Sequence, residues 1–321
     1  MKRTTLLCLC IAGFSALTGC AGAESAAPET VVTDSAEPES SDGISAEEPA
    51  VSRNLDDLVQ DGDGKYSCTF EGVKHDFIVD LPEQPAGAPC VIMLHGYGES
   101  AGGFRSAVRF EAQANPAGYA VVYVTGAANP NDKTSAAGWN SGISSDGNDD
   151  VSFLVTFANY LQTEYGFDPD RMFAAGFSNG AFMMHRLAME ASDTFAACVS
   201  VAGRMPESIW DARRESNAVG FFQITGEKDD VVPKNSDGSA KYSPAPAIED
   251  VMTYWAESDG LTLSETADAG KSGLLKKYTG DGKSVQVWDL FIKNGRHSWP
   301  DKDLTGIDTN QLILDFFEAQ K

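Results

Sequence analysis

Ser178 stands in a short motif that could make it a nucleophile. The motif, residues 176–180 (GFSNG), follows an apolar strand-like run over 172–175 and precedes a helix-like stretch over 181–188. A serine on a sharp strand-to-helix turn presents its hydroxyl, and the flanking glycines let neighbouring backbone approach where a Cβ would clash. Because the chain has 31 glycines, the pattern alone is weak and needs support from other residues.

A nucleophilic serine needs a general base, and histidine is the usual one. The chain has four histidines, which are His75, His95, His185 and His297. In strand–turn–helix sites of this kind the order along the chain is serine, acid, histidine. His297 alone lies far enough beyond Ser178 to follow an intervening acid, in a Gly- and Pro-containing loop after the apolar run 285–292. We therefore predict His297 as the base, and a structural role for His95, which precedes the serine.

A carboxylate is the third member of such a site, because it orients the imidazole and stabilises its protonated form. The apolar run 220–226 ends in glycine and is followed by three acids, Glu227, Asp229 and Asp230. Spacing does not choose among them.

An ester carbonyl under attack also needs hydrogen-bond donors for its developing negative charge. The expected donors are two backbone N–H groups. One belongs to Asn179, directly after the nucleophile, and the other to Tyr97, directly after His95-Gly96.

Six stretches together resemble the esterase family of the α/β-hydrolase superfamily that includes polyhydroxybutyrate depolymerases and feruloyl esterases. They are residues 94–98 (LHGYG), 138–140 (GWN), 149–153 (DDVSF), 176–180 (GFSNG), 226–233 (GEKDDVVP) and 297–300 (HSWP). They span about residues 65–321 in the family's order.

The resemblance implies the α/β-hydrolase fold and serine esterase chemistry. Its G-x-x-D-x-x-V-P pattern places the acid on Asp229. It also implies that Trp139, Asn140 and Trp299 lie beside the substrate, although core packing is an equal alternative for Trp139. The chain departs from better-known members at Tyr97, where many carry a small residue or Cys.

The elements that must position these residues alternate between strand-like and helix-like patterns. Continuous apolar runs over 90–94, 120–124 and 197–201 are typical of buried parallel strands, and helical spacing recurs over 151–161. We predict one α/β domain with a mostly parallel sheet and helices on both faces. A hairpin of exposed strands is expected over residues 66–81.

The N-terminus resembles a lipoprotein signal. A basic start and an apolar stretch too short to span a bilayer precede Leu17-Thr18-Gly19-Cys20, so residues 1–19 are predicted as the signal peptide and Cys20 as the lipidated residue. An ordinary secretory signal is the alternative. Residues 21–50 hold eight acids and no Lys or Arg. We therefore predict a disordered acidic linker over 20–60, a catalytic domain over 61–321, and location on the extracellular face of a bacterial membrane.

The net charge of −23, which becomes −25 on loss of Lys2 and Arg3, disfavours nucleic acid and anionic lipid surfaces as partners. Membrane contact is expected through the lipid anchor alone, and the protein is expected to be a monomer. The mature domain retains Cys68, Cys90 and Cys198, an odd number that gives no complete disulfide framework. No Cys/His spacing suggests a metal, and no cofactor is expected.

These observations favour a lipid-anchored serine carboxylesterase that releases feruloyl or acetyl groups from plant cell-wall polysaccharide. One alternative is hydrolysis of polyhydroxyalkanoate or small aliphatic esters. A second is a surface lipoprotein that binds glycans without turnover, which the presence of Ser178, Asp229 and His297 argues against.

Overall fold

The structure is a computed structural model that describes residues 54–62, 64–131, 133–144, 147–214, 218–234 and 245–320. The predicted signal peptide, Cys20 and residues 20–53 of the predicted linker lie outside the described residues. No helix within the described ranges is long and apolar enough to cross a membrane.

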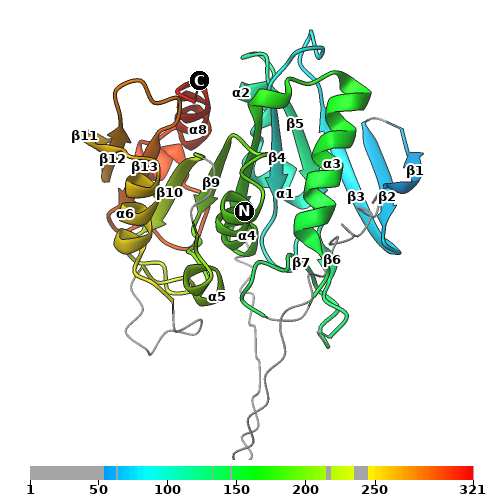
Figure 1. The fold of residues 1–321 in the computed structure, drawn as a ribbon, viewed down its shortest axis with the longest axis horizontal. Coiled ribbons are helices and arrows are strands. Elements are labelled where there is room, and N and C mark those ends of the chain that lie inside the picture. Colours follow the sequence, from blue (N-terminus) through cyan, green and yellow to red (C-terminus); the bar gives the residue numbers. More distant parts are fainter. Residues whose placement is uncertain are drawn as a thin grey trace, which may run out of the picture. The chain divides into compact units, whose positions relative to one another are not determined.

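A single large sheet organises the described domain (Figure 1), with eleven strands in the order β1-β2-β3-β5-β4-β8-β9-β10-β13-β12-β11. Its six central strands pair in parallel. They are β5 (Ala120–Val124), β4 (Cys90–Leu94), β8 (Met172–Phe177), β9 (Ala197–Val201), β10 (Gly220–Gly226) and β13 (Val287–Ile292). All five residues of β4 are buried, as the apolar run predicted for a strand covered on both faces. The predicted α/β fold is thus confirmed.

Antiparallel strands extend the sheet at both edges. They are β1 (Asp56–Gln60), β2 (Lys65–Phe70) and β3 (Val73–Asp80) at one edge, and β12 (Gly273–Thr279) and β11 (Thr262–Ala269) at the other. The predicted linker ended at residue 60, but β1 pairs with β2, so residues 56–60 belong to the domain. The predicted hairpin is present as β2–β3, yet its strands are half-buried, because Phe70 and Phe77 point into the core.

Helices cover both faces of the sheet (Figure 1). Side chains of α3 (Asp150–Tyr165), α4 (Asn179–Glu190) and α6 (Ile248–Ser258) join the core on one face. Those of α1 (Ala101–Val108), α2 (Glu111–Ala114) and α8 (Thr309–Glu318) join the core on the other. The shorter elements are the strands β6 (Ala127–Ala128) and β7 (Ala137–Gly138), the 3-10 turn η1 (Pro169–Arg171), and the helices α5 (Glu207–Asp211) and α7 (Lys302–Thr305).

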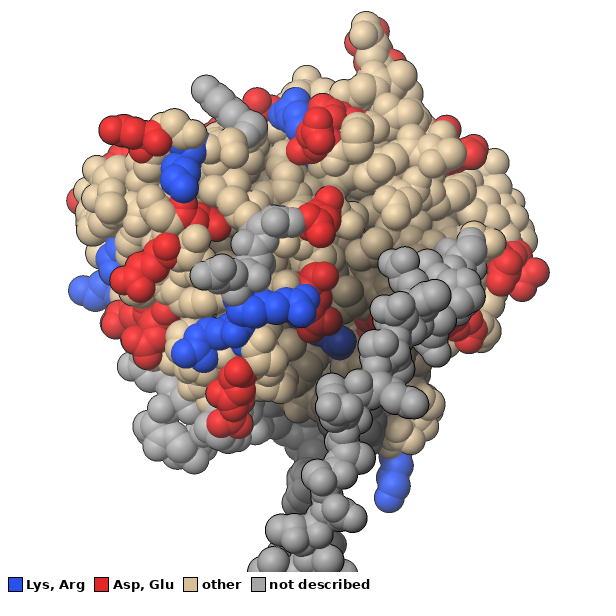
Figure 2. All heavy atoms as spheres, in the orientation of Figure 1, with Lys and Arg blue, Asp and Glu red and all other residues tan. Residues whose placement is uncertain are grey.

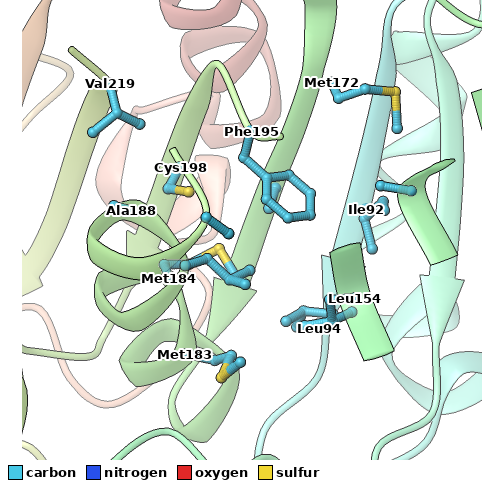
Figure 3. Packing of buried hydrophobic residues seen from close by; sticks show 14 of the residues in the cluster. Ile92, Leu94, Leu154, Met172, Met183, Met184, Ala188, Phe195, Cys198 and Val219 are labelled. Carbon is cyan, nitrogen blue, oxygen red and sulfur yellow. The ribbon is translucent and has the colours of Figure 1, made fainter. Parts of the chain in front are cut away.

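Packing of α4 fixes the helix that begins directly after Ser178. Met183 and Met184 of α4 are fully buried and belong to the same apolar cluster as Leu94 of β4 and Leu154 of α3 (Figure 3). Burying a side chain of this size stabilises the fold by roughly 1.5–3 kcal/mol. The turn at Ser178 therefore lies between two fixed elements, β8 in the sheet and α4 in the core.

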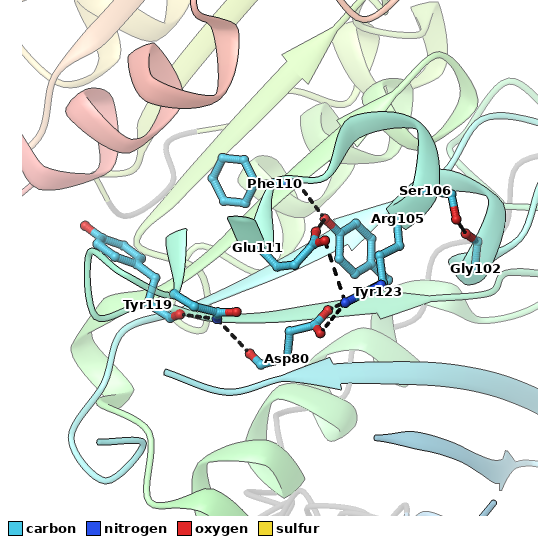
Figure 4. Close-up of polar contacts among 9 residues, drawn as sticks. Asp80, Gly102, Arg105, Ser106, Phe110, Glu111, Tyr119 and Tyr123 are labelled. Carbon is cyan, nitrogen blue, oxygen red and sulfur yellow. Dashed lines mark hydrogen bonds and ion pairs between the residues drawn. The ribbon is translucent and has the colours of Figure 1, made fainter. Parts of the chain in front are cut away.

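A polar network anchors α1 and α2 to the sheet (Figure 4). Arg105 donates from Nε and Nη2 to the two carboxylate oxygens of Asp80 at 2.6 and 2.7 Å. Tyr123 of β5 donates its hydroxyl to Glu111 at 2.8 Å and accepts from the Phe110 N–H at 3.0 Å. A two-pronged Arg–carboxylate pair is among the stronger polar contacts in proteins. The pair between Arg105 and Asp80 holds α1, which follows the loop at residues 95–99, against β3.

The three described cysteines, Cys68, Cys90 and Cys198, are free and buried. Cys90 and Cys198 behave as the small buried hydrophobes that their apolar strands predicted. Burial raises the pKa of the Cys68 thiol to about 12, so it stays protonated and unreactive at neutral pH.

Surface charge is unevenly distributed on the face drawn in Figure 2. Acidic and basic side chains are interspersed over the side that carries α6, β11 and β12, and fewer appear over the side that carries α3. Interspersed charges of both signs favour solubility rather than a single-sign docking surface.

Candidate active site

Ser178, His297 and Asp229 form one hydrogen-bonded line. His297 Nε2 lies 2.9 Å from Ser178 Oγ, and its Nδ1 lies 2.8 Å from Asp229 Oδ2. Because a carboxylate only accepts, Nδ1 carries the proton and Nε2 is left to accept from the serine hydroxyl. The three residues follow β8, β10 and β13, three parallel strands whose carboxyl ends meet at one edge of the sheet.

The turn at Ser178 is strained and needs both of its glycines. Ser178 has φ 52° and ψ −114°, in the half of the backbone map that non-glycine residues rarely occupy. Its N–H donates to Val201 O at 3.0 Å. A Cβ on Gly176 would lie 2.3 Å from Gly180 O, and one on Gly180 would lie 2.3 Å from Leu94 O. The motif's glycines are therefore required by backbone contact on both sides of the serine.

Asp229 is the acid that reaches the imidazole. Its side chain is 1% exposed, with Oδ2 at His297 and Oδ1 accepting from the N–H groups of Val231 and Val232 at 2.9 and 2.7 Å. Asp230 and Glu227 are exposed. Glu227 instead accepts from the Asn294 N–H at 2.8 Å, which ties the Asp229 loop to the His297 loop.

A buried arginine that the sequence analysis missed supports the acid loop. Arg204, in the loop after β9, is fully buried and donates from Nη1 to Pro233 O at 3.1 Å. Its only sequence signal was a basic residue directly after a glycine beyond an apolar strand. Its place beside the Asp229 loop depends on the pairing of β9 with β10.

The two predicted oxyanion donors lie on segments that flank the nucleophile. Asn179 is the first residue of α4, so its N–H has no acceptor within the helix. A Cβ on Gly96, directly before Tyr97, would lie 3.4 Å from Ser178 Cβ. The loop that carries Tyr97 is thus in direct contact with the serine.

His95 holds that loop from below. It is fully buried, its Nδ1 donates to Gly96 O at 2.6 Å, and its Nε2 accepts from the Gly126 N–H at 2.9 Å. Burial lowers the pKa of His95, which favours the neutral ring, and these two partners fix its tautomer. The structural role expected for His95 agrees with these contacts.

The other two histidines pack in the core. His75 stacks on Phe153 with ring centroids 3.7 Å apart, and His185 packs against Phe221 at 4.6 Å. Burial lowers the pKa of both rings, that of His185 to about 3. Both rings are therefore neutral at physiological pH.

The three side chains predicted to bind substrate each make contacts within the domain. Trp139 is 5% exposed, and its indole N–H donates to His95 O at 3.1 Å. Asn140 donates from Nδ2 to Asn148 O at 2.9 Å. Trp299 is half-buried, donates to Asn310 Oδ1 at 3.0 Å and packs edge-on against Phe104. The burial of Trp139 and its bond to His95 O agree with the core-packing alternative.

Asp150 is a second functional candidate that the sequence analysis did not single out, although it lies in the 149–153 stretch. Its carboxylate is 1% exposed, and Oδ2 accepts from the Asn140 N–H at 2.6 Å. Burial raises the pKa of Asp150 to about 7, against the opposing effects of the Asn140 hydrogen bond and nearby Arg186. A buried carboxyl that titrates near neutral pH therefore lies next to residues 139–141.

Asp150→Asn is expected to become more stable relative to the wild type as pH rises. The native carboxyl keeps its proton up to about pH 7, whereas the unfolded one loses it near 3.8. Between these values the native state binds more protons, so the wild type loses stability with increasing pH, by up to about 1.4 kcal/mol per unit. The neutral amide lacks this dependence. Urea unfolding of both proteins at pH 5, 6, 7 and 8 measures it, and a constant difference across the series would contradict it.

Among the described residues, no group of three or more His, Cys, Asp or Glu side chains could hold a metal ion. The Ser178–His297–Asp229 line supports nucleophilic chemistry, in which a serine hydroxyl is activated by an imidazole that a buried carboxylate orients.

Comparison with known proteins points to esterases. The model of the prolyl oligopeptidase family matches residues 106–254. NocK of Nocardia uniformis subsp. tsuyamanensis, named as a proposed esterase, is 28% identical over 241 residues, which cover 68% of this chain and 67% of that protein. Feruloyl esterase B of Piromyces equi is 28% identical over 230 residues, which cover 69% of this chain and 42% of that protein. This chain thus matches two thirds of the first relative and less than half of the second.

Solved structures support the fold. The acetyl xylan esterase from Aspergillus awamori superposes with a TM-score of 0.54 at 15% identity, over 82% of this chain and 98% of that one. At this identity the likeness shows a shared α/β-hydrolase architecture.

Proposed function

We propose that this chain is a lipid-anchored serine carboxylesterase of the α/β-hydrolase superfamily, which releases feruloyl or acetyl groups from plant cell-wall polysaccharide. The observation that carries the catalytic part is the line from Ser178 Oγ through His297 to Asp229, with both contacts shorter than 3 Å.

Each residue of the line has one role in the proposed reaction. Ser178 Oγ attacks the ester carbonyl while His297 Nε2 takes its proton, and the same proton then passes to the leaving alcohol. The result is an acyl-enzyme. Water, deprotonated by His297, attacks this ester in turn, and the carboxylate product leaves. Asp229 holds the imidazole in the required tautomer throughout.

The backbone N–H groups of Asn179 and Tyr97 are proposed to bind the carbonyl oxygen as it becomes negative. A donor of this kind contributes about 3–4 kcal/mol to transition-state stabilisation. The N-terminus of α4 adds its partial positive charge at the same place.

Exposed apolar side chains on the loops near Ser178 support an acyl group with an aromatic part. Tyr97 is 39% exposed and Val231 is 37%. Tyr97 follows the glycine that contacts Ser178, and Val231 lies two residues after Asp229. An exposed aromatic ring favours a flat, partly apolar ligand, since such rings stack on one another. The name of one relative, feruloyl esterase B, points to the same substrate class.

Tyr97→Ala is expected to lower kcat/KM for methyl ferulate about 10-fold and for p-nitrophenyl acetate by less than about twofold, because only the larger acyl group reaches the ring. Tyr97→Phe is the matched control, since it keeps the ring and loses only the hydroxyl bonded to Thr134 Oγ1 at 2.5 Å. Equal losses on both esters in Tyr97→Ala would show that Tyr97 does not select the acyl group.

The cellular setting is proposed from the sequence. A lipid on Cys20 and an acidic linker would hold the enzyme at the outer face of the membrane with reach towards an external polymer. The enzyme is proposed to act as a monomer, and its membrane contact is proposed to be through the lipid alone. Labelling with radioactive palmitate, compared with Cys20→Ala, tests the anchor.

Hydrolysis of p-nitrophenyl acetate, p-nitrophenyl butyrate and methyl ferulate by the purified protein, beside Ser178→Ala, tests the function. We expect turnover that disappears in the variant, with preference for ferulate or acetate. Preference for butyrate would favour the aliphatic-ester alternative. A folded protein with no turnover on any of the three would favour the glycan-binding alternative.

A further inference from the structure

A two-residue strand separates the two residues that carry the proposed oxyanion donors. Gly138, at the end of β7, lies between them: a Cβ built there would lie 3.1 Å from Asn179 Oδ1 and 3.1 Å from Tyr97 Cδ2. The neighbouring residue of the same strand, Ala137, accepts at its carbonyl from the Gly98 N–H at 2.7 Å. The Tyr97 loop and the start of α4 therefore both rest on β7 and the residues after it.

The amide oxygen and the amide nitrogen of the Asn179 side chain both bind this segment. Oδ1 accepts from the Trp139 N–H at 2.6 Å, and Nδ2 donates to Trp139 O at 3.1 Å and to Ser141 Oγ at 3.4 Å. The orientation of the amide follows from these partners, because one end must accept and the other must donate. Asparagine is the residue that offers one acceptor and one donor at this length.

The far side of the segment is held as well. The Asn140 N–H donates to Asp150 Oδ2 at 2.6 Å, and Arg186 Nη1 donates to Asn140 O at 2.6 Å. Arg186 in turn pairs with Glu190 one turn along α4. The peptide groups from Trp139 to Ser141 are thus fixed against α3 and α4, and they provide a rigid support for Asn179.

We propose that the Asn179 side chain is a positioning group, which sets the spacing between the two oxyanion donors by binding the Trp139 peptide. The inference rests on the proposed esterase function. Donors stabilise an oxyanion only within about 2.7–3.1 Å of it, and a misplacement of about 1 Å can cost on the order of 100-fold in rate. The Asn179 side chain acts on the Asn179 N–H through its own backbone, and on the Tyr97 N–H through Gly138. It therefore affects the transition state more than ground-state binding.

Asn179→Ala tests the proposal through p-nitrophenyl acetate hydrolysis. We expect kcat to fall about 10- to 100-fold with KM changed less than about twofold. A trifluoromethyl ketone that forms a tetrahedral adduct with Ser178 adds a second readout. Its inhibition constant should rise by the same factor as kcat/KM falls. A kcat within twofold of the wild type, or a lower kcat with an unchanged inhibition constant, would overturn the proposal.

Asn115→Ala is the matched control. Asn115 also uses its amide to hold backbone carbonyls, donating to Asp80 O at 3.1 Å and Tyr119 O at 2.9 Å, on the opposite face of the sheet from α4. We expect a lower melting temperature but unchanged kcat and inhibition constant. An equal loss of kcat in this variant would mean that general destabilisation explains both.

Asn179→Asp keeps the shape of the side chain and is the second variant if Asn179→Ala does not fold. Its carboxylate keeps the acceptor for the Trp139 N–H but opposes Trp139 O, so we expect a lower kcat at pH 8, and wild-type kcat would overturn the proposal. A wild type that hydrolyses no ester refutes the proposed function. An active wild type matched by its Asn179 variants refutes this inference alone.

Discussion

Replacing Asp229 by asparagine should lower kcat by about 10⁴-fold while the protein stays folded. The carboxylate accepts the Nδ1 proton of His297 at 2.8 Å, and this contact leaves Nε2 free to take the proton of Ser178. An amide can present its NH₂ group to Nδ1 and favour the other tautomer, in which Nε2 carries the proton and cannot act as a base. Hydrolysis of p-nitrophenyl acetate, with circular dichroism as a check on folding, measures the effect.

Asp230→Asn is the control for this variant. Asp230 is adjacent in sequence and of the same chemical type, but it is exposed, and Asp229 is the residue that bonds to His297. We expect kcat within about twofold of the wild type, since an exposed charge is largely screened by solvent. A large loss in Asp230→Asn, with activity retained in Asp229→Asn, would move the acid to Asp230.

Gly180→Ala should remove nearly all activity and lower the stability of the fold. The added Cβ would lie 2.3 Å from Leu94 O and 2.8 Å from His95 O, and these are backbone atoms that no rotamer change can move aside. Separation of α4 from β4 would displace the loop that carries Tyr97 from Ser178. We expect a loss of at least about 100-fold in kcat/KM and about 1–3 kcal/mol in the free energy of unfolding. Ester hydrolysis and urea unfolding measure the two effects.

Gly102→Ala provides the contrast. Gly102 is an exposed residue of α1, and the nearest atom to a Cβ there is Ile78 Cδ1 at 3.9 Å. Alanine should stabilise the helix by roughly 0.5–1 kcal/mol without changing activity. Equal behaviour of the two glycine variants would show that the close contact at Gly180 is relieved without cost to the site.

The central strands of the sheet could be predicted from local patterns of polarity, but the two outermost strands, β1 and β11, could not. The runs 90–94, 120–124 and 197–201 are continuous and apolar, so their burial on both faces was visible in the sequence. β1 and β11 have almost no buried residues and carry several acids, so they lack both the apolar run and the alternation that indicate a strand. Their strand conformation comes from pairing with β2 and β12.

The sequence by itself determined the nucleophile motif and the choice of His297, because a strand–turn–helix with glycines is local and the order of the triad left one histidine. Spacing left Glu227, Asp229 and Asp230 open, and the family resemblance placed the acid on Asp229. The tertiary structure supplies the physical reason, which is the parallel register of β10 and β13 together with two backbone N–H groups that hold that carboxylate inward. It also decided that Trp139 supports the site from within the core, and that the Asn179 side chain binds the Trp139 peptide. Both facts arise from contacts about 40 residues apart in the chain, and local patterns of polarity do not record such contacts.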